Sequence, residues 1–206
     1  MPIKTIIAAT FAIALGAGAA SAATITAVSN GAVIATPSSV TNAAPTSINV
    51  VSAFNEKSGV MLTSALAVNG GSIAVGTKVD SHMLFFNRVG NGGGKPNDSL
   101  TAGFSFSEQI LGFITATSAL NATDSLLGAV GTTYQTFRAR GFEGNDSVSL
   151  IGTNGLTTSL SITQPGDWFR VVTVAAPAPV PLPAAAPLLL AAIGSVVALR
   201  RRRKAA

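Results

Sequence analysis

The chain has 206 residues, of which 48% are hydrophobic and 10% charged, and it contains no cysteine. The absence of cysteine excludes disulfides, thiolate metal sites and a cysteine nucleophile. The net charge of +5 would suit a nucleic-acid partner, but six of the 13 cations lie at the two ends of the chain. Because residues 23–176 hold seven cations and eight anions, no nucleic-acid binding is expected.

The first 22 residues predict a signal peptide. Lys4 precedes an apolar run over residues 6–15, and the small residues Ala20, Ser21 and Ala22 form a signal-peptidase cleavage pattern. Cleavage after Ala22 would make Ala23 the first residue of the mature chain. The alternative is an uncleaved membrane anchor.

Residues 23–174 predict one all-β domain, since their length suffices for a single core. Residues 100–106 alternate strictly: Leu100, Phe104 and Phe106 fall on one face, and Thr101 and Ser105 fall on the other. Further strands are expected at residues 24–28, 32–35, 48–54, 60–68, 72–75, 79–87, 110–115, 134–138, 148–151, 159–163 and 168–174. One short helix is expected at residues 118–127.

Turn signals separate these strands. Asn30-Gly31, Asn69-Gly70 and Asn154-Gly155 each lie between two strand candidates and predict tight hairpins, because both turn positions tolerate positive φ. About a dozen short strands with such turns favour an antiparallel β-sandwich, of which the jelly roll is one form. The glycine-rich stretch 88–99 lacks the strand-loop-helix context of a phosphate site, so we expect a plain hairpin connection there.

Catalytic residues are scarce, and we expect no enzyme. His82 is the only histidine, and neighbouring residues of a strand point to opposite faces. Ser81 and His82 therefore cannot form a local nucleophile–base pair, whereas Asp80 and His82 share a face.

The dipeptide Asp-Ser occurs twice after Asn, at Asp98 and at Asp146. Loops of this kind supply oxygen ligands to Ca²⁺ in some secreted proteins. Asn and Asp also cap turns with their own side chains, and we favour this second interpretation.

The C-terminal 32 residues have three parts. Residues 175–183 are an Ala/Pro linker, residues 184–199 are apolar without charge, and Arg200, Arg201, Arg202, Arg203 and Lys204 form a basic cluster in residues 200–206. At about 1.5 Å per residue the apolar run reaches roughly 24 Å, and snorkelling arginines extend it. We therefore predict a membrane-spanning helix with its basic end in the cytoplasm, in preference to a buried core helix.

The start of this tail carries a specific resemblance. Val180, Pro181, Leu182, Pro183 and Ala184, followed by the apolar run and the terminal arginines, resemble the VPLPA variant of the PEP-CTERM sorting tail. The resemblance implies recognition by exosortase, a membrane protease or transpeptidase that cuts near the proline motif. Two prolines in four residues keep the backbone extended, as a protease requires.

Together these features predict a non-enzymatic bacterial protein that crosses the inner membrane, is anchored transiently and then reaches the cell surface or extracellular matrix. Its role would be structural or interactive. The alternative is a module that binds exopolysaccharide, with help from Ca²⁺ and an exposed aromatic platform, for which Trp168 and Tyr134 are the candidates. A hydrolase would need a site without histidine.

Overall fold

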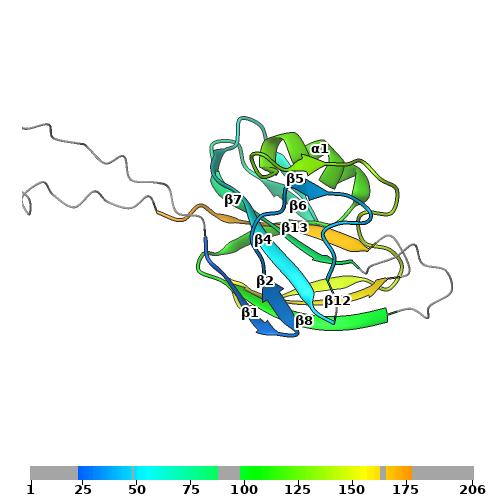
Figure 1. Cartoon of the computed structure of the whole chain (residues 1–206). Helices are drawn as coiled ribbons and strands as arrows, with labels where there is room; N and C mark the ends of the chain where they lie inside the picture. Colours follow the sequence, from blue (N-terminus) through cyan, green and yellow to red (C-terminus); the bar gives the residue numbers. More distant parts are fainter. Residues whose placement is uncertain (1–22, 48, 88–97, 163–165, 178–206) are drawn as a thin grey trace, which may run out of the picture. The chain divides into compact units, whose positions relative to one another are not determined.

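The structure is a computed structural model that describes residues 23–47, 49–87, 98–162 and 166–177 (Figure 1). These residues form several β-sheets and a single short helix, so the predicted all-β class is confirmed for the described part of the chain. Most strand pairs are antiparallel, and two pairs are parallel. The predicted membrane helix and most of the predicted signal peptide lie outside the described residues.

The first sheet has four strands in the order β1-β8-β12-β11. Its strands are β1 (Ile25–Ser29), β8 (Asp98–Phe106), β12 (Gly155–Ile162) and β11 (Ser147–Ile151). All three pairings are antiparallel, and they bring the first strand of the domain beside one from its middle.

The second sheet has five strands in the order β2-β4-β7-β13-β9. They are β2 (Gly31–Val33), β4 (Val51–Met61), β7 (Lys78–Phe86), β13 (Asp167–Val174) and β9 (Ile110–Ile114). β2 runs parallel to β4, and the other pairs are antiparallel. Smaller elements are the hairpin of β5 (Leu66–Val68) and β6 (Gly71–Ile73), the parallel pair β3 (Ser39–Val40) and β10 (Thr133–Tyr134), and helix α1 (Thr117–Leu127).

A first hydrophobic core lies between the two large sheets. Phe104 and Leu160 of the first sheet meet Leu84 and Phe169 of the second, and all four are at most 1% exposed. In β8 the predicted alternation is confirmed, because Phe104 faces this core while Thr101 is exposed. Burial of such side chains supplies the main driving force for pairing the sheets.

A second core covers the opposite face of the five-stranded sheet. Phe85 stacks on Trp168 with ring centroids 4.2 Å apart, and Leu120 and Leu127 of α1 pack into the same cluster. Figure 1 shows the resulting layers, with α1, β5 and β6 on one side of β4, β7 and β13 and the first sheet on the other. The central sheet is therefore buried on both faces.

The turns follow the predictions only in part. Asn69-Gly70 joins the antiparallel β5 and β6, as predicted, with φ of 79° at Gly70. A hairpin also joins β11 and β12, but its turn spans residues 152–154 with the positive φ of 64° at Gly152. The Asn30-Gly31 hairpin is wrong: Asn30 has φ of 47°, but the chain passes there from the first sheet to the second.

Two predicted strands also have different bounds. The expected strand at 60–68 is divided between the end of β4 and the start of the β5–β6 hairpin. The strand expected at 134–138 is reduced to the two residues of β10, with irregular chain after it. Propensity does not reveal where tertiary contacts end a strand, which is why these bounds shifted.

Candidate functional site

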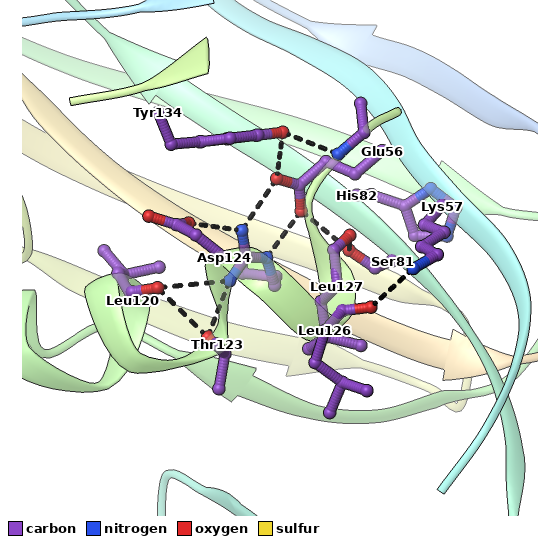
Figure 2. Close-up of polar contacts among 12 residues, drawn as sticks. Glu56, Lys57, Ser81, His82, Leu120, Thr123, Asp124, Leu126, Leu127 and Tyr134 are labelled. Atoms are coloured by element: carbon purple, nitrogen blue, oxygen red, sulfur yellow. Dashed lines mark hydrogen bonds and ion pairs between the residues drawn. The ribbon is translucent and has the colours of Figure 1, made fainter. Parts of the chain in front are cut away.

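The most elaborate polar cluster is buried between the five-stranded sheet and α1. Glu56 on β4 and Arg170 on β13 both have fully buried side chains. Arg170 Nε donates to Glu56 Oε2 at 2.5 Å and Nη2 donates to Oε1 at 2.8 Å (Figure 2). This two-pronged contact is the strong form of the arginine–carboxylate pair.

The cluster continues into α1. Arg170 also donates to Asp124 Oδ1 at 2.9 Å and to Thr123 Oγ1 at 2.6 Å. Asp124 in turn accepts from Arg140, whose Nη1 and Nη2 lie 2.5 and 3.0 Å from its two oxygens. Two cations and two anions therefore neutralise one another and fasten the helix to the sheet.

Two hydroxyl groups complete the surroundings of Glu56. Tyr134 donates to Glu56 Oε1 at 2.8 Å and accepts the Ala129 N–H at 2.9 Å (Figure 2). Ser81 Oγ lies 2.7 Å from Glu56 Oε2 and 2.9 Å from the Leu127 carbonyl oxygen, and it donates its one proton to one of them.

Burial and charge act on these groups in opposite directions. Burial alone would raise the pKa of Glu56, but the charge and hydrogen bonds of Arg170 hold that pKa below its usual value. Burial raises the pKa of Tyr134 well above its usual range, and the negative charge of Glu56 adds to the effect. Glu56 is thus ionised and Tyr134 protonated, and both carboxylate oxygens of Glu56 accept hydrogen bonds. The cluster is therefore suited to a structural role, holding α1 against the five-stranded sheet.

His82 lies on the other face of the same sheet. Its Nδ1 is 2.8 Å from Asn55 Oδ1 and its Nε2 is 3.1 Å from Thr173 Oγ1. Burial lowers the pKa of His82 to about 4, so the ring is neutral at physiological pH. Ser81 and His82 point to opposite faces, as predicted, and each is engaged by its own neighbours.

Asp80 holds the two ends of the described domain. Its Oδ2 accepts the backbone N–H of Ala23 at 2.7 Å and that of Ala176 at 3.1 Å, while Oδ1 accepts the Gly59 N–H at 2.6 Å. The Asp80 side chain lies on the same face of β7 as His82, but its carboxylate oxygens accept hydrogen bonds from backbone N–H groups. Figure 1 shows the same feature, since the chain enters β1 and leaves β13 on one side of the domain.

The two candidate Ca²⁺ ligands, Asp98 and Asp146, lie in different surroundings. Asp146 accepts the Glu143 N–H at 2.7 Å, which is turn chemistry, and also the N–H of Ser161 on β12 at 2.8 Å. Asp98 belongs to β8 and not to a loop, and its backbone pairs with Ile162, next to Ser161. Across the described ranges, no three potential ligand side chains come together in a way that would hold a metal ion. Calcium binding at Asp98 and Asp146 stays the less favoured of the two interpretations.

The aromatic candidates for sugar binding are placed unfavourably. Trp168 is fully buried in the second core, and Tyr134 is half-buried with its hydroxyl group engaged. Trp168 is therefore wrong as a candidate for an exposed stacking platform, whereas Tyr134 is partly exposed and stays a candidate.

Some predicted functional residues cannot be placed. The sorting motif (Val180 to Ala184), the basic cluster (Arg200 to Lys204) and the cleavage-site residues Ala20 and Ala22 lie outside the described residues. Ala23 is described and is fully buried. Among the described elements, none is a helix with the length and apolar character needed to cross a bilayer.

Sequence reasoning missed the Glu56–Arg170–Asp124–Arg140 cluster. The available signal was Arg170 itself, which stands in the strand Trp168–Val172 with apolar residues on both sides. Comparison with known protein families, with curated proteins and with solved structures gives no significant match to this chain.

Proposed function

We propose that this protein is an exported component of the bacterial envelope or extracellular matrix, delivered by an exosortase-type C-terminal sorting signal. The observation that carries the proposal is the order of three segments at the C-terminus: Val180 to Ala184, the apolar residues 184–199, and Arg200 to Lys204. A membrane span with a basic cytoplasmic end fixes the orientation, and the prolines hold the cleavage segment extended.

The position of the chain ends supports this proposal. Ala23, which follows the predicted signal peptide, and Ala176, the second residue of the linker, both donate their backbone N–H to Asp80 Oδ2. The two points from which the described domain continues into the predicted processing segments are therefore adjacent.

We further propose that the ectodomain is a β-sandwich with a non-enzymatic role. The shared core of the two large sheets supports the sandwich, with α1 as an additional layer. Three polar groups could serve catalysis, namely Ser81, His82 and Glu56. All three are buried, and each makes a side-chain hydrogen bond within the domain: Ser81 with Glu56, and His82 with Asn55. This engagement favours a structural or interactive role.

The test is replacement of both motif prolines, Pro181→Ala with Pro183→Ala. Export is expected to be unchanged, but processing should stop, because the helix can then extend through the recognition segment. The matched control replaces the linker prolines Pro177 and Pro179 with Ala and should be processed normally. Immunoblots of membrane and released fractions measure the outcome. Normal processing of the Pro181/Pro183 variant would contradict the sorting signal.

A second candidate function, binding of an exopolysaccharide, is favoured by the outer face of the first sheet. Across the register, Thr101 pairs with Ser159 and Ser159 with Ser147, and Gly103 pairs with Thr157 and Thr157 with Ser149. This face carries hydroxyl groups without charge, and hydroxyl groups both donate to and accept from sugars.

The second candidate is tested by co-sedimentation with the exopolysaccharide of the producing cell. Ser159→Arg places a bulky cation in the centre of the hydroxyl-bearing face and should reduce binding at least about tenfold, equivalent to about 1.4 kcal/mol. Thr153→Arg in the exposed β11–β12 turn is the control. Equal binding by both variants would exclude this face.

A further inference from the structure

Asp80 is a buried anion that lacks a cationic partner within the described residues. Its residue is 1% exposed, and its carboxylate oxygens accept three backbone N–H groups. The ion pairs of the described residues involve Glu56 and Asp124, not Asp80. A buried carboxylate without a counter-ion is costly even when it is hydrogen-bonded.

The neighbouring titratable group does not supply the missing charge. His82 lies two positions along β7 on the same face, and its ring nitrogens contact Asn55 and Thr173. Lys78, also on β7, is exposed. The negative charge of Asp80 is therefore not neutralised by a described side chain, and one positive group would balance it.

The nitrogen closest to Asp80 Oδ2 is that of Ala23, at 2.7 Å. Ala23 is fully buried, and it is the residue that cleavage after Ala22 would make the first of the mature chain. In the uncut chain this nitrogen is a neutral amide with one N–H. Hydrolysis of the Ala22–Ala23 bond consumes one water and leaves a carboxylate on Ala22 and an ammonium with three N–H groups on Ala23.

We propose that Asp80 is an internal binding site for the α-ammonium group that signal-peptide cleavage creates on Ala23. The proposal rests on the export function proposed above. Cleavage replaces a neutral amide donor by a cationic one at the same two atoms, so that a hydrogen bond to the carboxylate becomes an ion pair. The processed chain is therefore more stable than a chain in which Ala23 is still an amide.

The site also relates the two ends of the domain. Ala176, the second residue of the linker, donates its backbone N–H to the same Oδ2 atom at 3.1 Å. Fixing the Ala23 ammonium against Asp80 holds this oxygen in place for Ala176. Ala23 thus occupies the same place before and after cleavage, and only the charge on its nitrogen changes.

The experiment compares two mature chains that differ by one residue, 23–206 and 22–206, in the same detergent. In the first chain the ammonium is on Ala23. In the second it is on Ala22, and the nitrogen of Ala23 is again an amide. The Tm of chain 23–206 should be higher by at least about 3 °C. In the Asp80→Asn background, which keeps one oxygen but removes the charge, the difference should fall below about 1 °C.

A second measurement needs no substitution. An N-hydroxysuccinimide ester should acylate the α-amine of folded 23–206 at least tenfold more slowly than that of 22–206, with exposed Lys78 as the internal reference in mass spectra. Equal Tm values together with equal acylation rates would overturn the ammonium site and leave the export function intact. An exported protein whose N-terminus is not Ala23 would overturn both the predicted cleavage site and this proposal.

Discussion

Replacement of Arg170 by Met should be among the most destabilising single changes in the domain. The Arg170 side chain is fully buried and makes two hydrogen bonds to Glu56, one to Asp124 and one to Thr123. Met fills a similar length without charge, so the loss is chiefly electrostatic. Glu56 would then remain buried without its cation, and removal of one partner of such a pair costs about 3–5 kcal/mol.

This loss is large beside a typical total stability of about 5–15 kcal/mol. Urea denaturation followed by the fluorescence of Trp168, the single tryptophan, measures it directly. The matched control is Arg138→Met, the same substitution at an exposed arginine, which should change stability by less than about 0.5 kcal/mol.

The double variant Arg170→Met with Glu56→Leu separates the pair from its parts. Because the lone buried carboxylate is then gone, the combined loss should be smaller than the sum of the single losses by about 0.5–3 kcal/mol. A single Arg170→Met loss below about 1 kcal/mol, or full additivity in the double variant, would refute the claim that the pair is coupled.

Three further outcomes are expected. In urea denaturation, Phe104→Ala should lower the free energy of unfolding by about 3–5 kcal/mol and Thr101→Ala by under about 1 kcal/mol, because only Phe104 faces the core. Equal losses for the two variants would contradict a strand with one buried face. Since the pKa of His82 is lowered to about 4, its contribution to stability is present above its unfolded pKa of 6.5 and is lost as pH falls toward 4. The urea midpoint should therefore fall across this window, and a His82→Gln variant with the same slope as the parent would disprove the assignment. Millimolar Ca²⁺ should leave the Tm equal to that in chelator, because both Asp146 oxygens already accept backbone N–H groups; a rise that Asp146→Asn abolishes would restore the metal site.

The strands could be predicted wherever one face is apolar and the other polar. β8 is the clearest case, because its hydrophobic residues recur at every second position and a helix would distribute them around its axis. Helix α1 was also expected within one residue of its observed start. Local patterns of this kind carry their own periodicity, so a single sequence is enough to find them.

The buried polar cluster could not be predicted, because its partners are far apart in the chain. Glu56 and Arg170 are separated by 114 positions, and each alone has the appearance of an ordinary charge on a strand. Pairing depends on strand order, which one sequence does not contain. Asn30-Gly31 failed for a related reason: its turn chemistry was recognised, but the choice between returning to the same sheet and crossing to the other is made by tertiary packing.

The placement of β13 has a mechanical consequence for the proposed form of the protein that is held by its C-terminal tail. β13 lies inside the five-stranded sheet, bonded to β7 on one side and β9 on the other, and its last residues lead directly to Ala176. Hydrogen bonds between antiparallel strands are perpendicular to the strands. Tension applied through the linker along β13 would thus load both ladders in shear, many bonds at once, and would not peel them apart one by one. A domain tethered in this way resists drag on its outer surface best in the direction of its own anchor.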